Sequence, residues 1–383
     1  MLFGFVVPSL GVSNTGDKVE SKYMYYWDKN DVVNHSPAIT FLKSLSNYWN
    51  FQWNQEFDAV TGASRRLGFR NVGQQGDHNL VLDGITGASK KEIRHSEQAS
   101  LAYSHKGHNG SASFYFSDEN DYTSYSPALG GSWDFNERNT TLGGGVNLFL
   151  DHLHPQGVFA GLGGDRKITS STLSLTQILS PSTLVAITAN SIHSSGVLGH
   201  PYNPVVLGQG GMLIENLPTS KTSLALTGQL IQGYHLVDRR SSLHLEARYY
   251  QDSWKLASQT AEIQVYQYLT ENAFLRVRTR VYRQTHAALA KQQYQGNEVY
   301  RTADIRFFDF TLLSLGVKLA SSFPDTWADI GLLPDRWDFS YDQGIRNTRG
   351  EGGSVGPYYH YQLFPRDEYY MQGTFMMGLG WDF

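Results

Sequence analysis

The sequence predicts an all-β protein that forms a transmembrane antiparallel up-and-down β-barrel of about 16 strands, with 14 or 18 as alternatives. Three observations predict this fold. Segments with a two-residue period recur along the chain, the connections between them alternate between short and long, and no long helical pattern competes with them. Barrels of the bacterial outer membrane combine these features, because short turns join their strands at one end and longer loops at the other.

The composition agrees with a barrel. Charged residues make up 17% of the chain and aromatic residues 13%, whereas about 25% of the residues in soluble domains are charged. No apolar run approaches the ~18 residues that a membrane helix needs. The chain has no cysteine, which excludes disulfides and thiolate metal sites. Its net charge of −4 argues against a nucleic-acid partner.

The chain starts with MLFGFVVPSLG, which is apolar but lacks a basic start. We expect residues 1–18 to be an N-terminal arm or the remnant of a signal peptide, so that this start is not that of the native precursor. Residues 19–383 are predicted to form a single outer-membrane barrel.

The predicted strands have one apolar and one polar face. Alternation appears in VESKYMYYWDK, YWNFQWNQEFD, SASFYFS, SLHLEARYY, FLRVRTRVY and RWDFSYD. Side chains of a strand point alternately to its two faces, so the apolar faces should meet lipid and the polar faces should line the lumen. A soluble sandwich also has alternating strands, but nothing in a sandwich requires short and long connections to alternate.

Short turns are predicted at 45–48, 106–110, 136–139, 179–183, 237–241 and 269–273, with 323–334 as a longer member of this set. Longer connections are predicted near 28–36, 58–95, 151–167, 194–220, 285–310 and 347–367, and shorter ones near 117–122 and 252–256.

The connection from Asp58 to about His95 is far longer than a hairpin needs, and such loops are usually functional or disordered. It contains the repeated stretches FDAVTGAS and LDGITGAS. We expect an external loop that shapes the mouth of the barrel, and a mobile surface lid is the alternative. Its candidate residues are Asp58, Thr61, Gly62, Asp83, Thr86 and Gly87.

The chain ends in GTFMMGLGWDF, in which one face carries Phe375, Met377, Leu379, Trp381 and Phe383. This stretch resembles the C-terminal signal of bacterial outer-membrane proteins, which the barrel-assembly machinery reads. The resemblance implies a protein of the outer membrane of a Gram-negative bacterium, with outer-membrane lipid and the barrel-assembly machinery as partners.

Several stretches together resemble an uncharacterised family of predicted outer-membrane proteins, domain-of-unknown-function family 3570. They are FDAVTGAS, SWDFNERNTTLGGGVNL, SLTQILSPSTLVAITAN, GHPYNP and ARYYQDSW. The second TGAS copy has no place in the family pattern. The resemblance implies an outer-membrane barrel and little about its substrate. Members of that family look associated with envelope redox and flavin-transfer genes, which implies a redox lipoprotein as one partner to consider.

The polar faces predict a lumen lined by ionisable side chains. The candidate lumen-lining residues are Glu20, Glu56, Asp58, His244, Glu246, Arg248, Glu262, Arg276, Arg278, Arg280, Lys318, Asp338 and Asp342. Positions eight strands apart face each other in a barrel of about 16 strands, so Glu56 and Asp58 should face Arg248. Facing rows of opposite charge set a transverse field that selects dipolar or anionic solutes. The alternative is that structural ion pairs fill a plugged lumen.

The sequence therefore predicts a porin-like channel for the passive diffusion of small polar or anionic solutes. The alternative is a barrel scaffold or sheath that docks a periplasmic or surface partner such as a redox lipoprotein. His152 and His154 share one face of a strand end, but a metal site needs three or four ligands, so no metal or other cofactor is expected. No motif places a serine, a histidine and an aspartate together, so we predict no catalytic residue and no enzyme.

Overall fold

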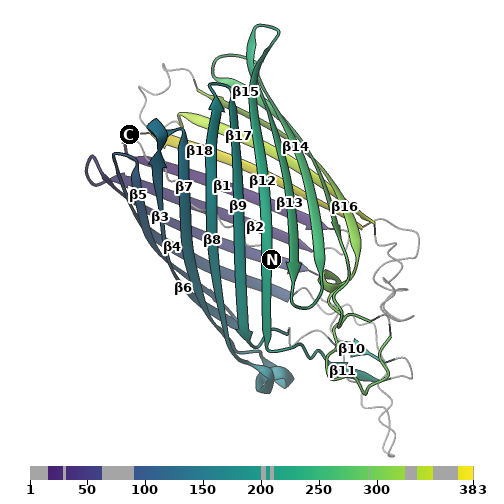
Figure 1. The fold of residues 1–383 in the computed structure, drawn as a ribbon. Helices are drawn as coiled ribbons and strands as arrows, with labels where there is room; N and C mark the ends of the chain where they lie inside the picture. Colours follow the sequence, from purple (N-terminus) through teal and green to yellow (C-terminus); the bar gives the residue numbers. More distant parts are fainter. Residues whose placement is uncertain are drawn as a thin grey trace, which may run out of the picture.

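The structure is a computed structural model that describes residues 16–28, 32–62, 90–199, 204–207, 211–291, 293–323, 334–347 and 370–382. Across these residues, sixteen antiparallel strands form one closed barrel (Figure 1). The chain runs around the wall in sequence order, and β18 pairs with β1 to close it. The predicted fold class and strand number are confirmed. No helix among these residues is long and apolar enough to cross a bilayer.

The barrel strands are β1 (Lys18–Asp28), β2 (Val33–Ser44), β3 (Trp49–Gly62), β4 (Lys90–His105), β5 (His108–Glu119), β6 (Tyr122–Phe135), β7 (Thr140–Leu153), β8 (Gly164–Ser180), β9 (Thr183–Gly196), β12 (Ser220–Leu236), β13 (Arg239–Asp252), β14 (Ala257–Tyr268), β15 (Ala273–Gln284), β16 (Phe310–Ser322), β17 (Arg336–Asn347) and β18 (Tyr370–Asp382). A separate two-stranded sheet consists of β10 (Pro204–Val206) and β11 (Met212–Ile214). Single 3₁₀ turns are η1 (Asn136–Arg138), η2 (Gly157–Leu162) and η3 (Ile305–Phe307).

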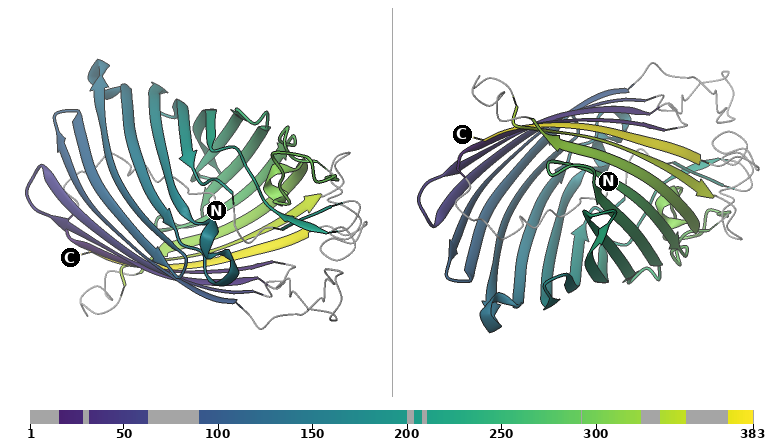
Figure 2. Two further views of the ribbon diagram at one scale, coloured as in Figure 1. Left: turned by 90° about the horizontal axis from the view of Figure 1, so that it is seen from below. Right: turned by 90° about the horizontal axis from the view of Figure 1, so that it is seen from above.

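The two ends of the barrel differ as predicted. At the turn end, β1 begins, β18 stops, and short connections join β2 to β3, β4 to β5, β6 to β7, β8 to β9, β12 to β13 and β14 to β15. At the loop end, the longest connections among the described residues join β9 to β12 and β15 to β16. Figure 2 shows the barrel from below (left) and from above (right), relative to the view of Figure 1. The predicted alternation of short and long connections is confirmed except near 28–36. The longer connection predicted there is wrong, because β1 ends at Asp28 and the pairing of β2 with β1 already begins at Val33.

The boundaries of the long loop predicted between Asp58 and about His95 were wrong. Asp58, Thr61 and Gly62 belong to β3, and β4 already starts at Lys90, because the pairing of β3 with β4 continues to Gly62 opposite Lys90. The alternation of FDAV continues that of the strand before it, so the strand does not stop at the first aspartate. The remaining candidate loop residues lie outside the described residues; they are Asp83, Thr86 and Gly87.

The alternation of the strands separates an apolar outer face from a polar inner face. On β16, Leu313, Leu315 and Val317 are 41%, 54% and 48% exposed, whereas Ser314 between them is buried. The same division holds on β6, where Leu129 is 70% exposed. On a soluble protein, so many exposed large apolar side chains would be unusual. They are expected where the surrounding medium is lipid.

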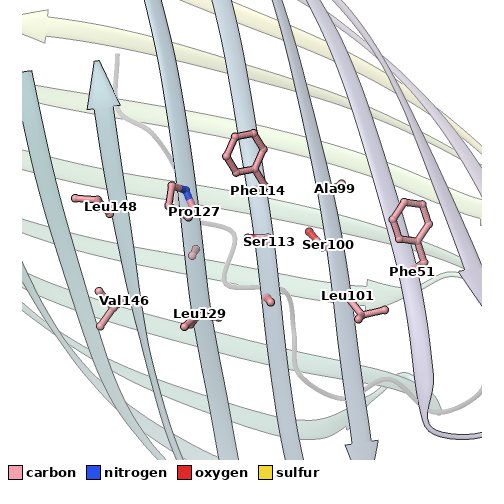
Figure 3. Close-up of a pocket in the computed structure, with 12 residues that line it drawn as sticks. Phe51, Ala99, Ser100, Leu101, Ser113, Phe114, Pro127, Leu129, Val146 and Leu148 are labelled. Carbon is pink, nitrogen blue, oxygen red and sulfur yellow. The ribbon is translucent and has the colours of Figure 1, made fainter. Parts of the chain in front are cut away.

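The outer face is hollowed over β3–β7. An apolar hollow of about 640 Å³ lies among Phe51, Leu101, Phe114 and Leu129, and its floor includes Pro127 (Figure 3). Pro127 lacks an N–H, and the pairing of β6 with β7 is interrupted at this position. Because its large side chains belong to the lipid-facing set, the hollow is a feature of the outer wall and not of the lumen.

The described parts of two long connections pack together as a loop cap, which we define as residues 197–199, 204–207, 211–219, 285–291 and 293–309. It contains β10 and β11, which lie beyond the ends of the barrel strands (Figure 1). The cap has a small core of its own, in which Leu217, Ala287 and Phe308 pack with Trp254 of the β13–β14 turn. The cap is therefore a folded unit attached to the rim of the barrel.

Tyr294 stabilises the inside of the loop cap. It is 2% exposed. Its hydroxyl accepts hydrogen bonds from the N–H groups of Lys291 and Thr302, and the carbonyl oxygens of Leu289 and Thr302 lie 2.9 and 3.1 Å away. Burial raises the pKa of the Tyr294 phenol, so the group stays a neutral donor and acceptor.

The predicted assembly face at the C-terminus points outward. Phe375, Met377 and Leu379 pair with Tyr341, Phe339 and Trp337 of β17, of which Phe339 and Tyr341 are exposed on the outer face. Trp381 follows on the same face of β18, and Phe383 lies outside the described residues. The strand thus presents its large apolar side to lipid.

Two adjacent methionines of β18 give a direct test of this orientation. Met377 is at mid-strand on the outer face, and Met376 is on the inner face opposite Ser340. Met377→Arg should destabilise the folded barrel by about 2–4 kcal/mol, because arginine at the bilayer midplane of a barrel carries that penalty. Met376→Arg should cost far less.

The measurement is urea unfolding of both variants in lipid vesicles, followed by tryptophan fluorescence and by heat-modifiable migration. Equal losses of stability in the two variants would contradict the assignment of the faces.

Candidate functional site: the charged wall of the lumen

The inner faces of β13–β17 form a wall of charged side chains, which we call the charged wall. Cross-strand pairing places Glu246 opposite Glu262, Glu262 opposite Arg280, and Arg276 opposite Lys318. The three arginines of RVRTR occupy every second position of β15, so all of them point to the same side. Long charged side chains on this side are tolerated because it faces the lumen and not the lipid.

Two of these arginines are partly neutralised by acidic partners. The Asp342 carboxylate on β17 lies 4.0 Å from Arg276 through its Oδ2 atom and 3.6 Å from Arg278 through its Oδ1 atom. A carboxylate oxygen of Glu262 lies 3.3 Å from Arg278. Asp342 reaches β15 across the intervening β16. It can do so because Gly316 stands in between, where a Cβ atom would lie 1.8 Å from the Asp342 Oδ1 atom.

Nearer the turn end, the charges are paired more closely. Lys318 lies 2.9 Å from Asp338. Arg336 lies 2.8 Å from Asp382 and 2.7 Å from Glu20, so it links β17, β18 and β1. Gly378 and Gly380 leave the inner face of β18 open for the side chains of Asp338 and Arg336. Glu20, Asp338 and Lys318 of this group were predicted from the sequence. Arg336 was not, although it opens RWDFSYD and shares the polar face of that strand.

Nearer the loop end, the described carboxylates do not neutralise all the positive charges. Among the described residues, neither Arg248 nor Arg280 forms an ion pair with a carboxylate, and the Nε atom of Arg280 is buried without a hydrogen-bond partner. The other candidates on β13 have neutral partners. Gln229 donates a hydrogen bond to Glu246, and His244 lies against the ring of Tyr266 at 4.6 Å. The charged wall therefore carries a net positive region around Arg248 and Arg280.

The opposite wall does not supply the facing row of negative charge that the sequence predicted. β3 does lie eight strands from β13, but Asp58 is 2% exposed and forms an ion pair with Arg94 of the neighbouring β4. The Ser36 hydroxyl also donates a hydrogen bond to Asp58, and Glu56 lies 3.9 Å from Arg94. Arg94 was not among the predicted lumen residues because it lies within 58–95, where the sequence predicts a loop.

Small hydroxyl side chains cover much of this opposite wall. Ser96, Ser117, Ser124 and Asp151 pair directly across β4, β5, β6 and β7 on the inner face, and all are buried. The row ends on β8 at Arg166, whose Nε donates to Asp151 at 2.7 Å. The lumen is thus asymmetric, because a neutral hydroxyl-rich wall faces the charged wall.

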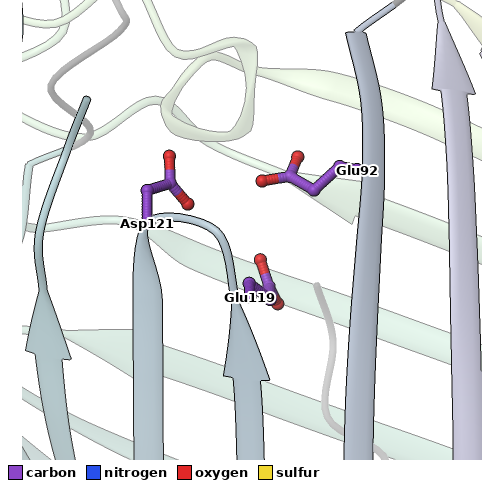
Figure 4. A group of neighbouring side chains, drawn as sticks. All are labelled: Glu92, Glu119 and Asp121. Atoms are coloured by element: carbon purple, nitrogen blue, oxygen red, sulfur yellow. The ribbon is translucent and has the colours of Figure 1, made fainter. Parts of the chain in front are cut away.

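Three carboxylates gather near the loop-end rim of this hydroxyl-rich side. One oxygen atom from each of Glu92, Glu119 and Asp121 lies within 4.8 Å of the others (Figure 4). The three residues are half-buried, and acidic side chains are often grouped in this way without a ligand. No other contact among the described residues points to a bound cation. The group adds negative charge on the side of the mouth opposite the charged wall.

A family model described as "Protein of unknown function (DUF3570)" matches residues 7–163 and 158–332. The chain belongs to the DUF3570 family. This confirms the resemblance seen in the sequence. No curated protein matches the sequence.

Solved structures show that the DUF3570 fold is that of outer-membrane barrels. A "Bacterial polysaccharide outer membrane secretin" is similar at a TM-score of 0.52 and 10% identity, over 97% of this chain and 100% of that one. "CdiB from Acinetobacter baumannii" is similar at a TM-score of 0.53 and 9% identity, over 96% of this chain and 60% of that one. Such low identities establish the fold alone.

The role of Gly316 in the DUF3570 protein can be tested through Asp342. Gly316→Ala should force the Asp342 carboxylate away from Arg276 and Arg278, since the new methyl group would occupy its place. Asp342→Asn should remove the negative charge outright. Both variants should therefore raise the preference of the lumen for anions, which is measured as a reversal potential in a salt gradient across a planar bilayer.

Gly228→Ala is the control, because a Cβ atom there meets nothing within 4 Å. If Gly316→Ala behaves like Gly228→Ala while Asp342→Asn shifts the reversal potential, the glycine does not hold the carboxylate in place.

Proposed function

We propose that this protein is an outer-membrane channel of a Gram-negative bacterium through which small polar solutes diffuse passively, and that it favours anions. The observation that carries the proposal is the positive charge of Arg248 and Arg280, which no carboxylate among the described residues neutralises. Low-dielectric walls focus the field of such charges into the lumen, so local charge governs selectivity more than the net charge of −4 does.

The asymmetry of the lumen supports the same function. A polar solute that crosses the barrel loses part of its hydration shell and needs other hydrogen-bond partners. The half-buried side chains of the charged wall can supply such partners and attract anions, whereas Ser96, Ser117 and Ser124 of the opposite wall are buried and add no charge. Weak contacts at many positions suit passage better than one tight site, since a solute must leave as well as enter. The proposal assigns no catalytic role to any residue.

The test is a pair of double variants with the same change in net charge. Arg248→Gln with Arg280→Gln should lower the chloride-to-potassium permeability ratio toward one, because it removes the unneutralised charges. Arg138→Gln with Arg239→Gln should keep the wild-type ratio, since both of these arginines are exposed at turn-end connections. Single-channel recordings in planar bilayers give both the conductance and the ratio.

Absence of any conductance in the purified wild type would overturn the channel. Equal chloride-to-potassium permeability ratios for the wild type and the two double variants would be compatible with a channel. They would show that the charged wall does not determine its selectivity.

A docking scaffold for a surface partner is the second candidate function. The observation that favours it is the loop cap, which has a core of its own and yet exposes Ile214, Val299 and Tyr300 at 43%, 68% and 46%. The two bridged stretches that carry these residues lie side by side, since Asn216 and Arg301 pair. Exposed apolar side chains that form a contiguous patch are typical of interaction sites.

Site-directed cross-linking can decide on the scaffold, because the chain has no cysteine of its own. Val299→Cys on the loop cap should cross-link to a discrete partner in intact cells. Val237→Cys is the matched control, as that valine is 86% exposed at the turn end. A surface scaffold predicts an adduct for Val299→Cys alone, and no adduct at either position would contradict it.

A further inference from the structure

The apolar hollow in the outer wall has a floor of short side chains and a rim of large ones. Ala99, Ala112 and Pro127 are exposed on the outer face and belong to its floor. In Figure 3, the rings of Phe51 and Phe114 stand on either side of Ala99. Phe114 pairs with Ala99 on one side and with Pro127 on the other, so a large ring separates two low points and the floor is uneven.

An aromatic belt on the outer face shows at which depth of the membrane the hollow lies. The rings of Trp49 and Tyr103 lie 5.0 Å apart near the turn end of β3 and β4, and Trp133 is exposed near the same end of β6. Such rings lie at the interface of lipid and water. Leu101 and Ala99 precede Tyr103 on β4, at roughly 7 and 13 Å along the strand. The apolar band of a barrel is about 25 Å tall, so the hollow lies in the leaflet at the turn end.

A positive charge lies just beyond this belt. Lys106 is exposed in the short turn between β4 and β5, where its φ is 49°. His105 and His108 flank the turn and pair with each other. The ring of His105 packs edge-on against Tyr48 at 4.6 Å, and His108 pairs with Trp133. An ammonium group beside aromatic rings at the level of the lipid headgroups is suited to the phosphate of a lipid.

The hollow requires a hydrocarbon occupant. It opens onto lipid, and water would find no polar partners at this depth. An empty hollow would lose dispersion contacts along its lining. A cavity of about 150 Å³ holds one benzene ring, so a hollow of about 640 Å³ has room for much of an acyl chain. A flexible chain can follow the uneven floor around Phe114, whereas a flat rigid lipid would rest on its ring.

Apolar packing alone selects weakly among lipids, because lipid tails are as apolar as the wall. The charge of Lys106 adds the selection, since it attracts a phosphate and not an uncharged headgroup. A phosphate held there places the acyl chains of the same lipid at the belt. The hollow begins at Leu101, which is within about 7 Å of the belt along β4. The charged and the apolar part of this surface therefore fit two parts of one molecule.

We propose that the outer wall over β3–β7 holds a glycerophospholipid of the leaflet at the turn end. One acyl chain lies in the hollow, the glycerol backbone lies at the aromatic belt, and the phosphate contacts the Lys106 ammonium group. The continuity of the hollow with the lipid-facing wall and the complementary charge of Lys106 support this occupant. The surface does not rest on the proposed channel, because it lies outside the barrel and requires no conduction.

Photo-cross-linking in lipid vesicles tests this surface. One probe is phosphatidylglycerol with a diazirine midway along an acyl chain, and the other is diacylglycerol with the same chain and no phosphate. The adducts are mapped on proteolytic fragments by mass spectrometry. Phosphatidylglycerol should label the outward residues of β4–β6 about fivefold more than those of β13 and β14, the factor expected for one lysine beside an anionic lipid. Diacylglycerol should label the two regions alike.

Three variants and two matched controls assign the effect. Lys106→Gln removes the cation, and Ala112→Phe or Ala99→Leu fills the floor, so each should abolish the excess of labelling by phosphatidylglycerol. Lys255→Gln is the control for charge, because Lys255 is also exposed in a turn, with a φ of 67°, but at the loop end. Ala261→Phe is the control for volume, because Ala261 is exposed on the outer face of β14, outside the hollow. Both controls should keep the excess.

Native mass spectrometry of the delipidated protein with added phosphatidylglycerol is the second measurement, and heat-modifiable migration verifies that each variant is folded. The wild type and both controls should retain one lipid more than the three variants. Even labelling around the barrel by phosphatidylglycerol would overturn the surface. An excess that survives in Lys106→Gln, or that diacylglycerol shares, would overturn the phosphate contact. An excess that survives in both folded filling variants would overturn the hollow as the site of the acyl chain.

Discussion

The structure depends on one constraint, which is that a backbone N–H or C=O inside a bilayer must find its partner within the protein. A sheet meets this requirement only when it has no edge. The pairing of β1 with β18 removes the last edge, and closure in turn separates an inside from an outside. Because side chains of a strand alternate, each of the sixteen strands must then be apolar on one side and is free to be polar on the other. Because the apolar side chains of the outer face contact the lipid, the inner face is free to carry the charged wall and the hydroxyl-rich wall.

The sequence predicts most of this fold because the constraint acts on every strand. Alternation in stretches such as FLRVRTRVY marks the faces, and the lengths of the connections mark the ends. The ends of strands were predicted less accurately where a strand continues beyond its alternating apolar pattern. β3 continues past Asp58, whose carboxylate is inside the barrel and bound by Arg94 and Ser36, so its charge is no sign of a loop. A two-residue period shows which side a residue occupies but not where the strand stops.

The partners of the charged groups could not be predicted for a different physical reason. An ion pair depends on how far a side chain reaches and on what stands in between, and both depend on the register between strands. Asp342 meets Arg276 and Arg278 two strands away because Gly316 leaves the space free. No periodicity in the sequence indicates this. For the same reason, the sequence does not indicate that Arg248 and Arg280 have no carboxylate partner among the residues that the structure describes.

The single side chain of Gln284 has a consequence for the molecule as a whole. It bonds to Tyr282 inside the lumen and to the backbone of the loop cap outside it. Anything that shifts the cap, such as a bound partner, would therefore alter the position of the Tyr282 phenol, and a contact that fixes the phenol would favour one arrangement of the cap. Thermodynamic linkage makes this relation reciprocal, so each event changes the equilibrium constant of the other by the same factor. The hydrogen bonds of the Gln284 amide therefore couple the loop cap energetically to the interior of the barrel.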